Sequence, residues 1–291
     1  MTGILLIDKP QEWTSHDVIG KLRGLLRLRR TGHAGTLDPM ATGLLTVFVG
    51  RATRAVEFAE AQEKTYVARL RLGITTDTQD TTGRVLETSD MQVSQAELEA
   101  ILPRFCGEIL QVPPMYSAIK IDGQRLYQLA RQGVEVERKA RPVTIHQLKL
   151  LGQAEDGFDL EVTCSKGTYI RTLCHDIGAA LGCGGAMAAL RRTRVGAFSI
   201  EEAHTLEEIQ VAEDRAQFLK PLDTLFADYP ALTVDERQEQ GIRNGQIVRT
   251  AEHPPGRVRV YGPSGVFLVL GEMKKGPELV TVKSFFKPNV S

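Results

Sequence analysis

Two separated segments alternate between apolar and polar side chains, and this pattern constrains the fold more than any other feature of the chain. In residues 66–72 every second position is apolar, while Arg69 and Arg71 lie on the other side. Residues 158–164 alternate in the same way. Because successive side chains of a strand point to opposite faces, each segment predicts a β-strand with one buried and one hydrated face.

Helical patterns lie between the predicted strands. Thr14 or Ser15 can cap a first helix, whose apolar residues recur at helical spacing over residues 18–26. Ser94 and Glu97 have the spacing of a capping box before a second helix. Two further helical patterns cover residues 125–132 and 173–181, whereas residues 75–83 are polar without apolar periodicity and predict a loop. The mixture of the two element types predicts an α+β protein.

The composition changes near residue 200, which predicts a second domain. Residues 201–239 contain eleven acidic and three basic side chains. Asp228-Tyr229-Pro230 is typical of a hinge. Short β-rich segments follow it over residues 258–261, 266–270 and 279–282, separated by Gly and Pro turns. We therefore predict a large domain over residues 1–228 and a small β-rich domain over residues 229–291, a size that can fold alone.

The charges of the chain cancel overall but are unevenly distributed. With 36 basic and 36 acidic side chains the net charge is zero, which taken alone argues against a nucleic-acid partner. Yet basic side chains gather in three groups, within residues 21–54, 120–141 and 191–194. Each group alone can be an ordinary solvated face. Together, and offset by acids elsewhere, they predict a surface that follows a phosphate backbone.

Several other kinds of site have no signal in the sequence. It contains no phosphate-loop, dinucleotide-binding or G-x-S-x-G motif, and its six histidines and four cysteines show no metal-ligand spacing. The N-terminal segment lacks the basic start of a signal peptide, and no apolar run approaches the length of a membrane span. We therefore expect a soluble, cytoplasmic protein that uses no metal and no cofactor.

The strongest candidate for chemistry is Asp38, in the glycine-rich segment 32–39. Asp-Pro alone is a common turn former, so a structural role is the plain alternative. A nucleophilic carboxylate must be ionised and yet shielded from water, and a nearby guanidinium serves both needs. Arg171 is the candidate partner, although the sequence alone does not bring the two side chains together.

Three ring side chains are secondary candidates. His33 lies in the same glycine-rich segment, where a solvated loop histidine is the alternative. Tyr66 and Tyr169 are expected on apolar strand faces, where a tyrosine most often belongs to the core. Beside a flat substrate, however, a tyrosine ring can stack and its hydroxyl can move a proton.

Five stretches of the first 200 residues resemble the TruB family of pseudouridine synthases. The longest, Gly32 to Gly43, resembles the signature loop of the family. The other four are Lys9-Pro10 with Trp13-Thr14-Ser15, Lys64-Thr65-Tyr66, Pro113 to Lys120, and Gly167 to Arg171 with Leu190 to Thr193. The C-terminal part resembles a PUA-like RNA-binding domain, mainly through residues 241–248. Thr46 and Ala186-Met187 depart from the usual family residues and concern local packing.

The resemblance implies both a fold and an activity. The fold would be a pseudouridine-synthase catalytic domain, with a central mixed, mainly antiparallel sheet flanked by helices, followed by the PUA-like domain. The activity would be the isomerisation of uridine to pseudouridine at position 55 in the T-arm loop of tRNA, reached by base flipping. This reaction neither gains nor loses a group or an electron, so no cofactor is implied.

The resemblance also implies roles for individual residues. Asp38 matches the catalytic aspartate, Tyr66 the tyrosine that stacks on the base, and Arg171 the arginine paired with the aspartate. The matching substrate-binding residues are His33, Tyr169, Leu190, Lys9, Pro10 and Lys64. RNA-backbone contacts are expected from an RNA-binding insertion at about residues 120–145 and from the third basic group, through Arg125, Arg138, Lys139, Arg141, Arg191 and Arg192.

The expected partner is tRNA, bound through its T-arm stem-loop by a monomer without an obligate protein partner or a membrane. Two alternatives stay open. One is a related synthase guided by an RNA partner, as in archaeal and eukaryotic homologues; the compact length and the insertion favour the stand-alone bacterial form. The other is an RNA-binding or tRNA-folding protein whose catalysis is incidental.

Overall fold

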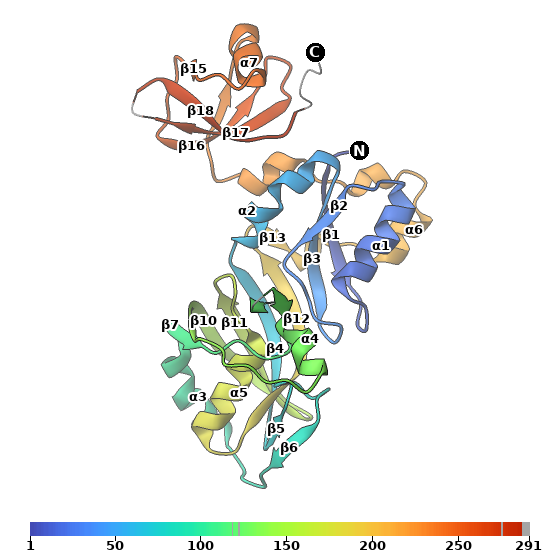
Figure 1. The fold of residues 1–291 in the computed structure, drawn as a ribbon, viewed down its shortest axis with the longest axis vertical. Coiled ribbons are helices and arrows are strands. Elements are labelled where there is room, and N and C mark those ends of the chain that lie inside the picture. The colour runs from blue at the N-terminus through green and yellow to red at the C-terminus, as the bar shows by residue number, and fades with distance from the viewer. Residues whose placement is uncertain (118, 122, 275, 287–291) are drawn as a thin grey trace.

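The chain forms an elongated body built on two sheets (Figure 1). The structure, a computed structural model, describes residues 1–117, 119–121, 123–274 and 276–286. Four parts of our predictions lie outside the described residues: position 118 of the motif 113–120, position 122 of the insertion, and positions 275 and 287–291 of the C-terminal domain.

Nine strands of the described chain form the large sheet. They are β1 (Gly3–Lys9), β2 (Thr31–Ala34), β3 (Thr42–Val49), β4 (Lys64–Leu72), β7 (Gly107–Gln111), β10 (Arg141–Ala154), β11 (Gly157–Cys164), β12 (Gly185–Val195) and β13 (Phe198–Ser199). The order is β1-β3-β12-β4-β11-β10-β7, with β2 on β3 and β13 on β12. Only β3 and β12 pair in parallel among these described strands. The prediction of a mixed, mainly antiparallel sheet is confirmed.

The centre of this sheet is where β12 lies between β3 and β4. The alternating segments of the sequence form β4 and β11, and the two strands pair along their length. On the other side of β12, Gly43 has a φ of 98° and faces the backbone of Arg192. A Cβ at Gly43 would overlap that backbone, so β3 and β12 can approach only because this residue is glycine.

Helices cover the sheet, and local signals set where several of them begin. They are α1 (Ser15–Leu26), α2 (Val56–Glu60), α3 (Gln95–Ile101), α4 (Leu126–Arg131), α5 (Ile170–Leu181), α6 (Leu206–Val211) and α7 (Glu236–Arg243), with 3-10 turns η1 (Gly50–Ala55), η2 (Leu102–Phe105), η3 (Ile200–Glu202), η4 (Arg215–Phe218) and η5 (Leu222–Phe226). The predicted cap at Thr14 and the predicted capping box of Ser94 and Glu97 are both confirmed. Helix α1 packs Val18, Leu22 and Leu26 against β1 and β3.

The acidic segment that follows the large sheet lies along its edge strand β1. The backbones of Ile4 and Lys220 exchange two hydrogen bonds of 3.0 and 2.8 Å. His204 bonds in the same way to Leu6 and Asp8, at 2.9 and 3.0 Å. Helix α6 then packs beside α1 (Figure 1), and its Leu206 and Ile209 share a core with Leu5 and Ile7 of β1. The edge of the sheet is thus covered by residues 200–226.

The C-terminal part forms a five-stranded sheet within the described residues. Its strands are β14 (Ala231–Thr233), β15 (Val248–Arg249), β16 (Gly256–Tyr261), β17 (Phe267–Met273) and β18 (Glu278–Ser284), in the order β14-β16-β17-β18-β15. The three strands expected near residues 258, 268 and 280 are confirmed. Phe226 joins this sheet to the rest of the chain, because its ring packs against Phe267 and Phe285.

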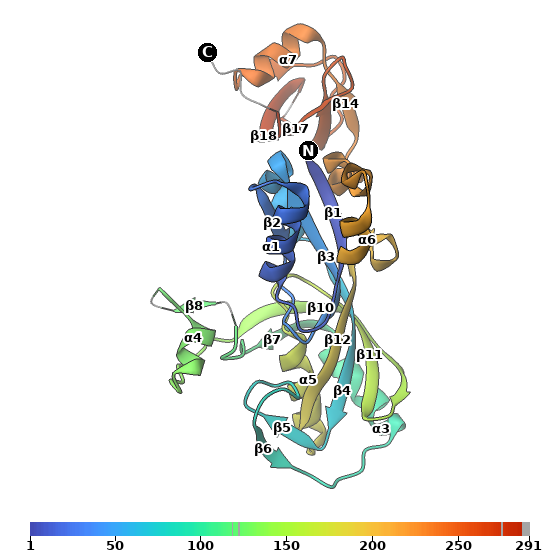
Figure 2. The ribbon, with the colours of Figure 1, turned by 90° about the vertical axis from the view of Figure 1, so that its right-hand side faces the viewer.

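Two hairpins stand apart from the sheets. One pairs β5 (Ile74–Thr76) with β6 (Val85–Thr88). The other pairs β8 (Lys120–Ile121) with β9 (Gln124–Arg125) and leads into α4. Together with α4, the second hairpin projects away from the large sheet (Figure 2). No helix in the described part of the chain is long and apolar enough to cross a membrane.

The structure corrects three local predictions. Gly32 to Ala34 were expected in a loop, but they belong to β2, because their backbone pairs with β3. Tyr169 was expected on a strand; it is instead the residue that precedes α5, with extended backbone angles. The segment 75–83, expected to be a loop, begins within strand β5.

Candidate active site

The loop that carries Asp38 connects β2 to β3 and is held in place by hydrogen bonds to residues before and within α1. Its backbone at Leu37 exchanges two hydrogen bonds with the hydroxyl of Ser15, the first residue of α1, at 2.9 and 3.2 Å. The Glu12 amide donates to the carbonyl of Pro39 at 2.8 Å. The loop is therefore held in place on both sides of Asp38, and Asp38 itself remains 41% exposed at its side chain.

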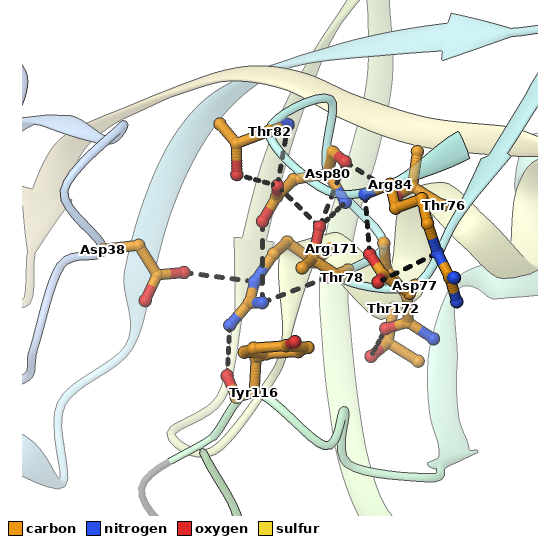
Figure 3. A network of polar contacts seen from close by, with 11 residues as sticks. Asp38, Thr76, Asp77, Thr78, Asp80, Thr82, Arg84, Tyr116, Arg171 and Thr172 are labelled. Atoms are coloured by element: carbon orange, nitrogen blue, oxygen red, sulfur yellow. Dashed lines mark hydrogen bonds and ion pairs between the residues drawn. The ribbon is translucent and has the colours of Figure 1, made fainter. Parts of the chain in front are cut away.

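Asp38 and Arg171 form the central ion pair of the site. The Arg171 Nε lies 3.1 Å from Asp38 Oδ2 (Figure 3). Arg171 sits in the first turn of α5, and its side chain is only 8% exposed. Its two terminal nitrogens donate to the carbonyl oxygens of Thr78 and Tyr116, at 3.1 and 2.7 Å. The guanidinium is thus immobilised while the carboxylate that it faces stays accessible.

A second carboxylate, Asp80, lies behind the same guanidinium. Its Oδ2 is 3.6 Å from Arg171 Nη1, and its side chain is 7% exposed. Its Oδ1 accepts hydrogen bonds from the hydroxyls of Thr78 and Thr82 and from the Thr82 amide, at 2.8, 2.6 and 3.0 Å (Figure 3). Because all these donors hold Asp80 still, Asp80 in turn fixes Arg171.

Sequence reasoning missed Asp80. We read residues 75–83 only as a polar loop. The available signal was the cluster of Asp and Thr side chains, which are the residues that bond to nearby backbone and to each other in tight turns. The link to Arg171 depends on contacts between residues far apart in the chain, which no local pattern contains.

The expected base-stacking tyrosine lies in the same cluster as the loop. Tyr66 is buried on β4 and shares a core with Leu37 and Leu190. Burial raises the pKa of its hydroxyl, and the positive charge of Arg192 opposes this rise. Tyr66 is therefore protonated at neutral pH, which leaves it able to donate a proton or a hydrogen bond.

Tyr169 lies close enough to Asp38 for the two groups to interact electrostatically, and His33 lies on β2, before the Asp38 loop. The Tyr169 backbone is clamped by the amide side chain of Gln111, which accepts at 3.0 Å and donates at 3.2 Å. Burial raises the pKa of the Tyr169 hydroxyl. Burial and the charges of His16 and Arg192 lower the pKa of His33 to about 4, so its ring is neutral at pH 7. Its edge packs against His16, with 5.6 Å between ring centroids.

Lys9 and Lys64 do not fit the substrate contacts that we expected of them. The Lys9 ammonium is fully buried and donates to the carbonyls of Pro10 and Trp13 at 2.9 and 2.6 Å. The Lys64 ammonium donates to the carbonyls of Glu60 and Gln62 at 2.9 and 2.7 Å. Both ammonium groups are already occupied by backbone. Pro10, the third residue expected at the substrate, is half-buried, and its carbonyl is one of the acceptors of the Lys9 ammonium.

The predicted RNA-backbone residues divide into exposed and buried ones. Arg125, Lys139 and Arg141 are exposed on or next to the projecting insertion. Arg138 is only 20% exposed and pairs with Glu135 at 2.9 Å. Arg191 is 44% exposed and pairs with Asp8 at 2.7 Å.

Arg192 contradicts our prediction. It is 1% exposed and donates to the carbonyls of Leu44 and Gly35, at 2.7 and 3.0 Å. A guanidinium so covered cannot contact a phosphate backbone, and the sequence missed this because adjacent arginines usually form a solvated face.

Comparison with protein families covers almost the whole chain. The "TruB family pseudouridylate synthase (N terminal domain)" matches residues 23–170. The "tRNA pseudouridylate synthase B C-terminal domain" matches residues 171–227, and the "Pseudouridine synthase II TruB, C-terminal" family matches residues 230–280. The resemblance found in the sequence is confirmed.

Individual proteins agree with this. The chain is 46% identical over 272 residues to a tRNA pseudouridine synthase B of Aromatoleum aromaticum, covering 93% of this chain and 88% of that protein. It is 47% identical over 279 residues to the protein of the same name from Syntrophomonas wolfei, covering 94% and 93%. Among solved structures, a Cbf5-Nop10-Gar1 complex contains a chain that is 25% identical, with a TM-score of 0.75 over 99% of this chain and 86% of that one.

Proposed function

The chain belongs to the TruB family of pseudouridine synthases, and we propose that it isomerises the uridine at position 55 in the T-arm loop of tRNA, with Asp38 as the catalytic carboxylate. The observation that carries this proposal is the contrast between the two members of one ion pair. Arg171 is buried and bonded to two backbone carbonyls, whereas the side chain of Asp38 is 41% exposed. A carboxylate paired with a fixed guanidinium on one side and open on the other can attack the sugar or take a proton.

The reaction asks for a carboxylate and a closed apolar pocket. The N1–C1′ bond of uridine breaks, the uracil rotates, and C5 bonds to C1′; a proton leaves C5 and one is gained at N1. Asp38 either adds covalently to the sugar or removes a proton at C2′. Tyr66, Tyr169 and Leu190 supply rings and an apolar wall that keep the detached base in place. No atom or electron from a cofactor enters this balance.

The target uridine must leave its loop before it can react. Flipping a base out of its stack costs a few kcal/mol, and stacking on an aromatic ring returns about 1–3 kcal/mol. Contacts with phosphates supply the remainder. In our proposal Arg125, Lys139, Arg141 and Arg191 make these contacts, with Arg138 supporting the insertion.

In our proposal each of the two sheets belongs to a domain with its own function. Residues 1–228 form the catalytic domain, with the projecting insertion at about residues 120–145 gripping the RNA. Residues 229–291 form a PUA-like domain that binds RNA. The protein acts as a cytoplasmic monomer on tRNA and needs no protein partner, as expected of a stand-alone enzyme.

The test uses the purified full chain, tRNA labelled with tritium at C5 of uridine, and no added protein or guide RNA. We expect the wild type to release tritium and to form pseudouridine at position 55 only. Asp38→Ala should abolish release while tRNA binding stays within about twofold, because removing one small side chain leaves the phosphate contacts intact. The control Asp90→Ala changes an aspartate away from the site and should be fully active.

Release that survives in Asp38→Ala contradicts the role of Asp38. A wild type that binds tRNA but releases no tritium points instead to an RNA-binding or tRNA-folding protein, or to a synthase that requires a guide RNA.

A further inference from the structure

Arg192 occupies an unusual place for an arginine. It lies on β12 at the centre of the large sheet, opposite Gly43 on β3 and opposite Tyr66 on β4. It is the bulkiest of the fully buried side chains in the described chain. Burying a charged guanidinium costs several kcal/mol unless it is well bonded, so its position calls for a reason other than packing.

The hydrogen bonds of Arg192 connect the two ends of the catalytic loop. Nη2 donates to the carbonyl of Gly35, directly after β2, and Nε donates to the carbonyl of Leu44, near the start of β3. Asp38 lies between these two carbonyls in the sequence. One planar guanidinium therefore fixes the distance between the strand ends that hold the Asp38 loop.

The glycine at the start of the loop fits this arrangement. Gly35 has a φ of 78°, and a Cβ there would lie 3.3 Å from Arg192 Nη1 and 3.4 Å from Lys64 Cε. The close approach of the loop to the guanidinium thus depends on a missing side chain.

The charge of Arg192 is not neutralised by a carboxylate. In the described part of the chain no acidic group lies within ion-pair distance of Arg192, Lys9 or Lys64. All three cations are buried and bond to backbone carbonyls: Arg192 and Lys9 to carbonyls at the ends of the Asp38 loop and beside it, and Lys64 to those of Glu60 and Gln62. The charge of Arg192 acts on Tyr66, on the neighbouring strand, and the charges of Lys9 and Asp38 act on each other. Both are groups that our proposed reaction needs in a defined state.

We propose that Arg192 is a positioning residue for the isomerisation: it sets the Asp38 loop and the Tyr66 ring in their reactive arrangement and makes no contact with the phosphates of the RNA. This inference rests on the proposed function. It assigns to Arg192 an effect on the rate of the chemical step and none on the affinity for tRNA.

The test compares Arg192→Gln and Arg192→Lys with the matched control Arg71→Gln, an exposed arginine on β4. Single-turnover tritium release and tRNA affinity at several salt concentrations are measured for each, with thermal unfolding to report the folded fraction. We expect Arg192→Gln to lower the single-turnover rate by about 100-fold, since a small misplacement of reacting groups has effects of that size. Its Kd and the salt dependence of its Kd should match those of the wild type.

Arg192→Lys should recover part of the lost rate, because an ammonium keeps the charge but reaches only one of the two carbonyls. Arg71→Gln should equal the wild type. Should Arg192→Gln not fold, Gly35→Ala replaces it, since its methyl group would lie 3.3 Å from Arg192 Nη1 and its φ of 78° would strain the loop at its contact with the guanidinium. We expect this variant also to lose rate while it keeps its affinity.

Three results would overturn the inference: a wild-type rate in folded Arg192→Gln, a weaker Kd with a smaller salt dependence, or Arg192→Lys no faster than Arg192→Gln. When Gly35→Ala is the variant tested, a wild-type rate overturns it in the same way. All of these results require a wild type that releases tritium. A wild type without release contradicts the proposed function instead, so the two failures are distinguishable.

Discussion

The Arg171 guanidinium lies between two carboxylates, 3.1 Å from Asp38 and 3.6 Å from Asp80, and only Asp38 opens to solvent. The two acids therefore have different tasks. Asp80 is held by Thr78 and Thr82, and its side chain is only 7% exposed, so it is not accessible to a ligand. Asp38 is accessible to a ligand, and Asp80 maintains the position of its partner Arg171.

Asp80→Asn should slow the reaction without preventing RNA binding. The amide still accepts hydrogen bonds from Thr82 but no longer carries the charge that holds Arg171. We expect the single-turnover rate to fall by about 10–100-fold and the free energy of unfolding by about 2–4 kcal/mol, because a buried pair loses one charge. Single-turnover kinetics and urea unfolding measure both effects.

The same substitution at Asp159 is the control. Asp159 pairs with Arg69 on the sheet surface, where an ion pair contributes little. Equal losses in Asp80→Asn and Asp159→Asn would show that the buried network has no special role.

Lys9 should make the stability of the protein depend on pH in the alkaline range. Burial lowers the pKa of its ammonium from 10.5 to about 8. Between these values the unfolded chain binds a proton that the folded chain has released, so the free energy of unfolding rises with pH. From pH 8 to 9.5, the wild type should gain about 1–2 kcal/mol relative to Lys9→Met.

Urea unfolding at the two pH values measures this difference. The exposed Lys166 serves as a control, because Lys166→Met should change with pH as the wild type does. If the wild type and Lys9→Met respond to pH identically, Lys9 is not buried as a charged group.

Removing charge from the insertion should weaken RNA binding in a salt-dependent way. Arg125→Gln, Lys139→Gln and Arg141→Gln each take away one exposed cation. We expect each to raise the Kd for tRNA and to reduce the slope of log Kd against log salt by about 1. Arg104→Gln, exposed but outside the basic groups, should leave both quantities unchanged. Filter binding over a range of salt concentrations decides between a phosphate surface and an ordinary solvated face.

Gly43→Ala should destabilise the centre of the large sheet. Its φ of 98° is unfavourable for alanine, and the new methyl group overlaps the Arg192 backbone. The expected loss in the free energy of unfolding is about 3 kcal/mol or more. Gly24→Ala is the opposite case, because this helical glycine has open space around it, and it should gain about 0.5–1 kcal/mol. A Gly43→Ala protein as stable as the wild type would mean that β3 and β12 can separate freely.

Sequence patterns predicted the parts of this protein that depend on neighbours in the chain. The caps at Thr14 and Ser94 and the strands β4 and β11 follow from spacing within a few residues. Asp38 could be found as well, because a glycine-rich loop is visible locally. Its partner Arg171 was named from chemistry and from family resemblance, and the structure supplies the distance.

Whether a charged side chain is buried or exposed was harder to predict from sequence. Arg191 and Arg192 are adjacent, yet one is exposed and the other is buried, because alternate side chains of β12 point to opposite faces of the sheet. Nothing in a run of two arginines says which one points inward. The burial of Lys9 and Lys64 could not be predicted for a similar reason: the carbonyls that surround them meet only when the chain is folded.

The acidic segment along β1 should protect the protein from edge-to-edge aggregation. Strand β1 is almost entirely buried apolar sequence and ends the large sheet. An open edge of this kind would pair with the edge of another molecule. The backbone bonds of His204 and Lys220 occupy that edge, and the surrounding glutamates repel a second chain. A protein cut before Glu201 should therefore aggregate through β1, whatever the state of its active site.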